Sequence, residues 1–448
     1  MRRDILILLA VAAVVLLVNL GSGSLNSWDE AFYAQVSREI LEQNDWVNMH
    51  WTGKTWIDKP PLYMWFTALF YKLFGVTEFA ARLFSAIAGM GLVIFTYLLG
   101  RRLFSRNVGI ISALMLLGSY HFISFSKAGT MDITNAFFVC AAMYFFVMGE
   151  NDRRNLILSF LCFSLAFLTK SFGAMVIPMI LGIYVIVGRK WHLVFNRYFA
   201  IGATLALVIV GSWHLTVYMQ YGDRFVQDYI LKHLVARTSV TLDGHEGGLL
   251  SYINVILYKA KPWGAVGLVV LPFFIFFSIW KKERENYLLI VWIFVLYALF
   301  TTIRTKLHWY IMPIYPAVML VGGWGMDKLL KKKALIVTVI IFIGGMAYLG
   351  IKKDIFTLDY NPEIKQLATS VSEVSSDTRP VYLYRIGDPG MQFYFGGGLG
   401  KNIQYENEIV TGEDGAVIVS RQDELDKLDI KGQVIPSGRD DLTAIIIE

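Results

Sequence analysis

Long apolar runs, separated by short polar and often basic segments, dominate the first 350 or so residues. A helix needs about 20 apolar residues to cross the hydrocarbon core of a bilayer. Runs close to that length predict about eleven membrane-spanning helices, at approximately residues 4–21, 79–100, 108–125, 132–149, 155–169, 172–188, 199–219, 263–280, 286–303, 309–325 and 334–351. We therefore expect an α-helical polytopic membrane protein, with a transmembrane domain over residues 1–351.

The first loop, residues 22–78, carries two further helical patterns. Residues 28–43 place apolar side chains among polar neighbours at helical spacing, which predicts an amphipathic helix on the membrane surface. Pro60–Gly75 is apolar but short and opens with two prolines, so it is interpreted as an interfacial or re-entrant helix. Further along, the short arms 155–169 and 172–188 predict a tight hairpin with Lys170 at its tip.

The pattern changes after about residue 352. Helical periodicity covers 362–374, and strand-like runs follow at 381–385, 416–420 and 444–447, separated by turn residues. Residues 352–448 are therefore predicted to form a small α/β domain.

Composition supports a membrane protein. Of 448 residues, 56% are hydrophobic and only 17% are charged, which is more apolar side chain than a soluble fold could bury. Lys and Arg gather in alternate loops, so we interpret the net charge of +6 as a signal of membrane orientation and not as a nucleic-acid site. This distribution of basic residues predicts a cytoplasmic N-terminus, with the first loop and the C-terminal domain outside the cytoplasm. The first run is interpreted as an uncleaved span, with a cleaved signal peptide as the alternative.

Charged and aromatic residues are concentrated in the first outer loop. Asp29 and Glu30 follow the first span closely and, with Tyr33, lie where a carboxylate could act as general base on an acceptor hydroxyl. The alternative is a solvated acid pair at the start of a surface helix. In Asp58-Lys59-Pro60-Pro61 the prolines fix the backbone, so Lys59 is held where an ammonium suits a phosphate oxygen; otherwise it anchors the interface.

Other outward loops add candidates on the same side. Asp132 begins the fourth span and offers a second carboxylate, or an ordinary acid at a helix start. His233 and Arg237, four residues apart, would share a helix face as a metal ligand beside an anion clamp, although a surface histidine is the alternative. Tyr310 could donate a hydrogen bond to a phosphate or serve as an interfacial aromatic. Such a pocket suits a substrate with an anionic head and an apolar tail.

Several of these motifs resemble glycosyltransferase family 39 of the GT-C superfamily, which holds the protein O-mannosyltransferases and the lipid A aminoarabinose transferases. The resemblance covers about residues 1–325. It rests on Trp28-Asp29-Glu30-Ala31-Phe32-Tyr33, Asp58-Lys59-Pro60-Pro61-Leu62, Phe74 to Leu83, Asp132, Leu168-Thr169-Lys170, and Lys306 to Pro316.

The resemblance implies an inverting transfer from a polyprenyl-phosphate sugar to lipid A, another lipid, a glycan or a protein, on the outer side of the cytoplasmic membrane. It makes Asp29 and Asp132 the catalytic acids and brings Lys59 and Tyr310 to the donor phosphate. Phe32 stands where some relatives carry an arginine, and Lys170 or Arg237 would replace that phosphate contact. Asp58 and His233 match positions that hold a divalent metal in relatives, and Glu30 and Tyr33 complete the expected site.

Two alternatives remain. A transporter or flippase of lipid-linked sugars would need ionisable residues near the bilayer midplane and paired repeats, which the sequence does not display. A sensor with a ligand-binding C-terminal domain would leave the elaborate first loop without a role.

Overall fold

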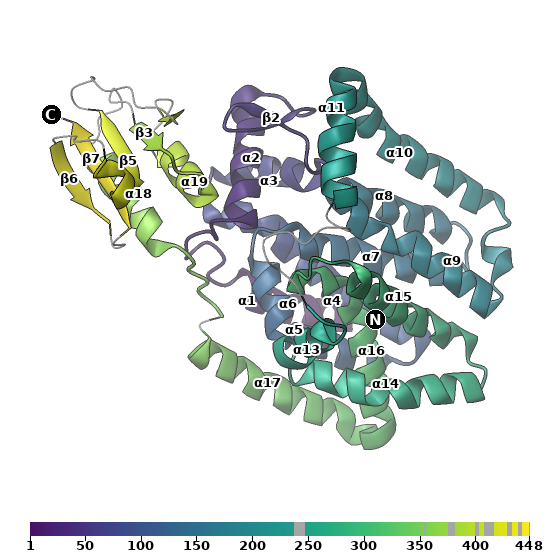
Figure 1. Ribbon diagram of the computed structural model, residues 1–448. Coiled ribbons are helices and arrows are strands. Elements are labelled where there is room, and N and C mark those ends of the chain that lie inside the picture. Colours follow the sequence, from purple (N-terminus) through teal and green to yellow (C-terminus); the bar gives the residue numbers. More distant parts are fainter. Residues whose placement is uncertain are drawn as a thin grey trace. The chain divides into compact units, whose positions relative to one another are not determined.

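The computed structural model describes residues 1–236, 247–353, 355–374, 381–398, 403–406, 416–427, 432–437 and 441–447. Its elements are labelled in Figure 1. The chain forms two compact units. The first comprises residues 1–18, 57–63 and 84–356, and the second comprises residues 19–56, 64–83 and 357–448.

The first unit is helical. Its α-helices are α1 (Arg2–Leu17), most of α4 (Glu78–Leu103), α5 (Arg106–Leu117), α6 (Tyr120–Lys127), α7 (Met131–Met148), α8 (Asn155–Ala174), α9 (Val176–Gly188), α10 (Arg197–Tyr221), α11 (Asp223–Phe225), α13 (Ser251–Lys259), α14 (Trp263–Trp280), α15 (Tyr287–Thr302), α16 (Tyr315–Leu330) and α17 (Ala334–Lys352). Tighter or wider turns connect them, namely η1 (Trp191–Leu193), the π-helix η2 (Val226–Ala236), η3 (Arg284–Asn286), η4 (His308–Ile314) and η5 (Lys331–Lys333).

Every apolar run that predicted a span lies on one or two of these helices. Seven helical segments of the described chain are long and apolar enough to cross a membrane, or eight if the α5–α6 pair, bent by 67°, counts as one span. One of the seven, His308–Lys352, contains both α16 and α17. The multi-pass helical architecture is therefore confirmed, and the count of eleven spans stays a prediction.

Helix packing in this unit brings the loop ends together. Helix α8 packs against α7 and α10, and α16 packs against α5 and α14 (Figure 1). The α14–α16 contact is close because Gly267 has no side chain: a Cβ there would lie 2.6 Å from the Val318 carbonyl oxygen. Helix α7 also contacts η4, so Asp132 and Tyr310 come from neighbouring elements.

Helix α8 is interrupted at Lys170, where the sequence predicted a break. Its backbone there is extended, with φ −153° and ψ 83°, before the chain continues through Ala174 and into α9. The break is therefore confirmed at the predicted residue.

The second unit combines the first loop with the C-terminal segment. The loop contributes α2 (Asp29–Gln43), the antiparallel hairpin β1 (Met49–Trp51) and β2 (Lys54–Trp56), and most of α3 (Leu62–Phe74). The C-terminal segment contributes α18 (Pro362–Val374), β3 (Val381–Tyr384), α19 (Pro389–Gly398), β4 (Ile403–Glu406), β5 (Val417–Arg421), α20 (Gln422–Leu425), β6 (Gly432–Pro436) and β7 (Leu442–Ile447). The predicted helices at 28–43, 60–75 and 362–374 and the three predicted strands are confirmed.

The C-terminal strands form one five-stranded sheet in the order β4-β3-β5-β7-β6. Strand β3 pairs in parallel with β4 and β5, whereas β7 pairs antiparallel with β5 and β6. Side chains of α18 and α19, including Leu367 and Phe395, share a buried core with Val381 and Val417 of the sheet. Burial of this apolar surface stabilises the C-terminal part of the unit.

Helix α19 also packs against α2 of the first loop. Phe393 is buried with Leu25, Ala31 and Ala34, and the Tyr394 hydroxyl accepts a 2.7 Å hydrogen bond from the Leu25 amide. The first loop and the C-terminal segment therefore share one core. The predicted domain division at residue 352 itself stays a prediction.

The β1–β2 hairpin was not predicted from the sequence. Thr52 and Gly53 turn the chain with φ of 53° and 74°, and both amides donate to the Glu39 carboxylate, at 2.8 and 3.0 Å. Phe32 of α2 packs on the rings of Trp51 and Trp56, with centroids 4.8 and 5.2 Å away. In this chain Phe32 therefore fixes the hairpin to α2.

Candidate functional site

A cavity of about 730 Å³, including its open mouth, lies in the first unit. It is lined by Asp58, Lys59, Pro60, Asp132, Asn135, Lys170, Ser171, Phe172, Gly173, Tyr229, Phe300, Ile303, Tyr310 and Pro313. The cavity thus brings together five predicted site residues from separate loops: Asp58, Lys59, Asp132, Lys170 and Tyr310.

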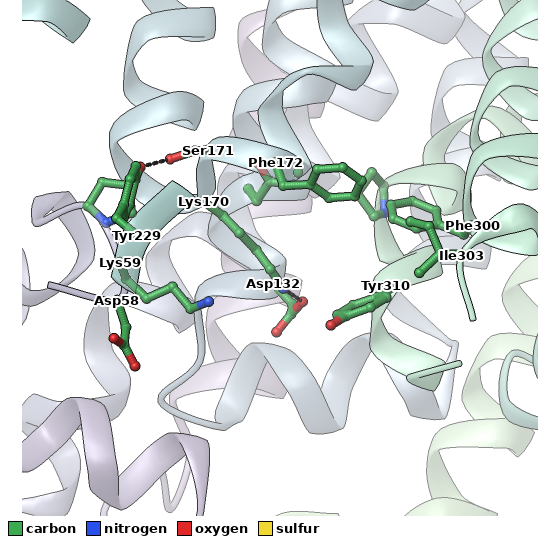
Figure 2. Close-up of a pocket in the computed structure, with 14 residues that line it drawn as sticks. Asp58, Lys59, Asp132, Lys170, Ser171, Phe172, Tyr229, Phe300, Ile303 and Tyr310 are labelled. Atoms are coloured by element: carbon green, nitrogen blue, oxygen red, sulfur yellow. Dashed lines mark hydrogen bonds and ion pairs between the residues drawn. The ribbon is translucent and has the colours of Figure 1, made fainter. Parts of the chain in front are cut away.

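The lysine of the double-proline motif reaches the cavity because of its local sequence. Pro60 and Pro61 restrict the backbone after Lys59, and α3 begins directly behind them at Leu62. The Lys59 ammonium is directed toward the space beside Asp132, whereas the Asp58 carboxylate points away from it (Figure 2). Lys59 is therefore placed to meet an anion in the cavity.

Lys170 and Asp132 form an ion pair inside the cavity. The Lys170 Nζ lies 2.6 Å from Asp132 Oδ1, and the Asp132 side chain is only 6% exposed. The same Nζ lies 5.0 Å from the ring centroid of Tyr310, whose hydroxyl faces the Asp132 side of the cavity (Figure 2). Two ammonium groups and a phenol therefore converge where a phosphate could accept hydrogen bonds.

The end of α15 is held by the half-buried Lys306. The Lys306 ammonium donates hydrogen bonds to the carbonyls of Phe300, Thr301 and Ile303. Burial lowers the pKa of this ammonium. Because Phe300 and Ile303 line the cavity, Lys306 shapes its apolar wall without facing the ligand space.

Three polar lining residues were not singled out from the sequence. Ser171 follows Lys170, Tyr229 comes from η2, and Asn135 lies three residues after Asp132 on α7. The spacing of Asn135 from Asp132 could have indicated a shared helix face. Tyr229 carried no such signal, because only packing brings η2 to the cavity; burial raises the pKa of its hydroxyl.

Glu30 belongs to a buried ion pair in the second unit. Its Oε1 accepts a 2.7 Å hydrogen bond from Arg82 Nε, and its Oε2 accepts one of 2.9 Å from the Asn26 amide. Arg82 also donates to the carbonyls of Leu20, Gly23 and Ser24. These contacts support a structural role for Glu30, and its predicted contact with substrate stays a prediction.

Asp29 and Tyr33 also lie in the second unit. Asp29 is the exposed first residue of α2, and Tyr33 is buried one turn later, edge-on to Phe32. The cavity lies in the other unit, so the predicted role of Asp29 as the catalytic acid stays a prediction, as does the role of Tyr33.

The predicted metal site is only partly described. Within the described ranges no group of three or more His, Cys, Asp or Glu side chains could hold a metal ion. Asp58 lines the cavity, while Arg237 and the side chain of His233 lie outside what the structure describes. Metal binding by Asp58 and His233 therefore stays a prediction, and no chemical step is derived from it.

The architecture is that of the GT-C membrane glycosyltransferases. The structure is similar to the crystal structure of ArnT from Cupriavidus metallidurans bound to undecaprenyl phosphate, with a TM-score of 0.81. The match covers 98% of this chain and 97% of that one at 20% sequence identity. This likeness confirms the predicted fold class.

Sequence comparisons give a family match for part of the chain and several similar proteins. Residues 58–214 match the model of dolichyl-phosphate-mannose-protein mannosyltransferases. A protein of Proteus mirabilis, named undecaprenyl phosphate-alpha-4-amino-4-deoxy-L-arabinose arabinosyl transferase 2, is 30% identical over 338 residues, which are 72% of this chain and 60% of that protein. Residues 58–214 therefore resemble this glycosyltransferase family, and the predicted resemblance is confirmed.

A further relative is an uncharacterized protein of Aquifex aeolicus, 26% identical over 325 residues. That match covers 72% of this chain and 63% of the relative. The matched region thus spans about three fifths of the length of these two relatives.

Proposed function

We propose that this protein is an inverting glycosyltransferase that moves a sugar from a polyprenyl-phosphate donor to an acceptor at the outer face of the cytoplasmic membrane. The observation that carries the proposal is the convergence of Lys59, Lys170 and Tyr310 with Asp132 in one cavity. The names of the relatives, which specify sugar transfer from undecaprenyl phosphate, support the same chemistry.

The cations suit the leaving group. When the bond between the anomeric carbon and the phosphate oxygen breaks, negative charge grows on the phosphate. Lys59 and Lys170 offset that charge, and the Tyr310 hydroxyl donates a hydrogen bond to it. Because phosphate leaves as an anion, no general acid is required at this step.

The incoming hydroxyl completes the exchange. Its oxygen attacks the anomeric carbon from the face opposite the phosphate, so the configuration inverts, and its proton passes to a base. Asp29 is the proposed base, and polyprenyl phosphate is released. An acceptor that is already ionised, such as a phosphate, would need no deprotonation, and Asp29 would then only orient it.

The acceptor is proposed to be lipid A, another lipid, a glycan or a protein on the non-cytoplasmic side. The relatives named as aminoarabinose transferases favour a lipid of the cell envelope. A transporter of lipid-linked sugars, the alternative from the sequence, would move the donor without releasing polyprenyl phosphate.

The test is sugar transfer by membranes that contain the full chain. Undecaprenyl phosphate-4-amino-4-deoxy-L-arabinose and undecaprenyl phosphate-mannose serve as donors, with lipid A as acceptor, and released undecaprenyl phosphate is measured. We expect Lys59→Met to lower release at least about 100-fold. The substitution removes a positive charge that offsets the negative charge developing on the phosphate. Lys72→Met, which changes an exposed lysine of α3 away from the cavity lining, is the matched control. Equal release by wild type and Lys59→Met would overturn the role of Lys59.

Asp29→Asn adds a second arm to the assay. With a hydroxyl acceptor we expect transfer to fall by roughly 100-fold or more, the contribution usual for general-base catalysis. With a phosphate acceptor we expect a much smaller loss. Undiminished transfer to a hydroxyl acceptor would remove Asp29 from the mechanism.

A further inference from the structure

We infer that Asn135 and Ser171 form a subsite that accepts hydrogen bonds from hydroxyl or amino substituents of the transferred sugar. The inference rests on the proposed function for the identity of the ligand. It assigns sugar recognition to two residues on α7 and α8, apart from the cations that meet the phosphate.

Asn135 presents an acceptor that the protein itself leaves unused. The residue is 3% exposed and lines the cavity, and its Oδ1 has no hydrogen-bond partner within the described part of the chain. An unpaired buried amide oxygen is unfavourable, so nearly all such atoms in folded proteins find a donor. A donor group on a bound ligand would satisfy this one.

The Ser171 oxygen can only accept a hydrogen bond from a ligand, because its own proton is engaged within the protein. His214 Nδ1 lies 2.8 Å from the Val210 carbonyl, which can only accept, so the neutral ring carries its proton on Nδ1. Nε2 then accepts from the Tyr229 hydroxyl at 2.9 Å. The Tyr229 proton is then engaged, so Tyr229 accepts the proton of Ser171 in the contact that Figure 2 draws between them.

The same conclusion holds if Ser171 donates elsewhere. Among the described residues, its other acceptor is the Phe167 carbonyl, at 3.3 Å. In both arrangements the single hydroxyl proton is engaged by the protein, and only lone pairs of the Ser171 oxygen remain for a ligand.

The cavity is therefore divided by hydrogen-bond character. Lys59, Lys170 and Tyr310 offer donors, which suit the acceptor-only oxygens of a phosphate. Asn135 Oδ1 and the Ser171 oxygen offer acceptors. The oxygens of a phosphodiester have no proton to donate to them, and an isoprenoid tail has no polar group. The remaining part of the donor lipid is its sugar, whose hydroxyl or amino groups are hydrogen-bond donors.

The test compares the binding of three lipids to the purified full-length protein in nanodiscs, without acceptor. The lipids are undecaprenyl phosphate, undecaprenyl phosphate-4-amino-4-deoxy-L-arabinose and undecaprenyl phosphate-mannose. We expect wild type to bind at least one sugar-bearing lipid more tightly than the bare lipid. We expect Asn135→Leu to weaken only that sugar-bearing lipid, by roughly 10- to 100-fold.

Thr134→Val is the matched control. Thr134 is the neighbouring residue on α7, is fully buried, and has an Oγ1 that likewise lacks a partner among the described residues, but it does not line the cavity. We expect this variant to bind all three lipids as wild type does. We also expect neither substitution to lower thermal stability, because each removes an unpaired buried atom.

Gly173→Ala tests the position of the amide without deleting it. A Cβ at Gly173 would lie 2.8 Å from Asn135 Nδ2, so the amide must shift. We expect the sugar-bearing lipid to bind more weakly and the bare lipid to bind unchanged.

Two results would overturn the inference: equal affinity of wild type for bare and sugar-bearing lipids, or an Asn135→Leu variant that keeps the full preference for a sugar. Failure of the proposed reaction is separate, because these measurements involve no transfer. A protein that transfers no sugar but loses its sugar preference in Asn135→Leu would support the subsite and contradict the enzymatic proposal.

Discussion

The Lys170 ammonium lies 2.6 Å from Asp132 Oδ1 and 5.0 Å from the centre of the Tyr310 ring. Asp132 was predicted as a catalytic acid, and this geometry supports a role for it in positioning Lys170. A carboxylate that accepts a hydrogen bond from an ammonium holds that ammonium in a fixed position, here beside the proposed phosphate site. Asp132 is therefore better suited to position Lys170 than to remove a proton from an acceptor.

Replacing Lys170 should weaken the site for phosphate. We expect Lys170→Met to lower the affinity for undecaprenyl phosphate by about 10- to 100-fold, the range for a lost hydrogen bond to a charged group. The matched control is Lys190→Met, which breaks an ion pair of similar length, 2.7 Å to Glu150, away from the cavity. Binding is measured by titration of the protein in nanodiscs. An equal loss in both variants would mean that the effect is structural.

The buried Arg82–Glu30 pair should contribute mainly to stability. Arg82→Met leaves a buried carboxylate without its charge partner, and we expect it to lower the free energy of unfolding by about 3–5 kcal/mol. We expect the double variant Glu30→Met, Arg82→Met to recover part of that loss. Unfolding is measured by denaturant titration in detergent. A stable double variant without transfer activity would instead give Glu30 a direct role in the reaction.

The stability of the second unit should fall in alkaline solution because of Tyr394. Burial, and then the nearby Glu78 carboxylate, raises the pKa of this hydroxyl above its ordinary value of 10.0. The unfolded chain therefore loses the proton first, so the hydroxyl stabilises the fold below about pH 10 and this contribution is lost as the pH rises further. We expect Tyr394→Phe to be less stable than wild type at pH 8, with a difference that shrinks by pH 11. A constant difference would contradict this assignment.

The predicted metal ligands can be tested by chelation. If Asp58 and His233 hold a divalent cation that the reaction needs, EDTA should abolish transfer and an added divalent cation should restore it. Asp58→Asn should then require a higher metal concentration for half-maximal rate. Transfer that is unaffected by EDTA would remove the metal from the proposal.

Membrane orientation follows from single-cysteine labelling. The two natural cysteines, Cys140 and Cys162, are buried and should react little. Cysteine introduced by Lys427→Cys, in the C-terminal segment, should react with an impermeant maleimide on intact spheroplasts. Cysteine introduced by Lys332→Cys, in the basic loop before α17, should react only after lysis. The opposite pattern would place the C-terminal segment in the cytoplasm and contradict the predicted orientation.

Much of the fold was accessible from local pattern. The apolar runs, the amphipathic helix that became α2 and the strands at 381, 417 and 442 all follow from periodicity within one segment. The double proline after Lys59 and the break at Lys170 were also local signals, because each changes the backbone where it occurs. Lys59 was identified as a site residue from its local signal, whereas Lys170 was named as one only through the family resemblance.

Contacts between segments that are distant in the sequence could not be predicted from local patterns. The pairing of Glu30 with Arg82 joins residues 52 positions apart, and Tyr394 meets Leu25 across 369 positions. Tyr229 likewise becomes a cavity residue only through the packing of η2. Nothing in the sequence around Tyr229 indicated that location, whereas the spacing of Asn135 from Asp132 was a local signal that was not used.

The shared core of α2 and α19 has a consequence for biosynthesis. The first loop leaves the ribosome early, yet its partners, including Asp359 for Ser24 and Tyr394 for Leu25, are translated more than 300 residues later. Until the C-terminal segment is synthesised, the loop lacks these packing partners and part of its apolar surface stays exposed. Maturation of the segment that bears Asp29 is therefore a late event, and it depends on delivery of the C-terminal portion to the same side of the bilayer.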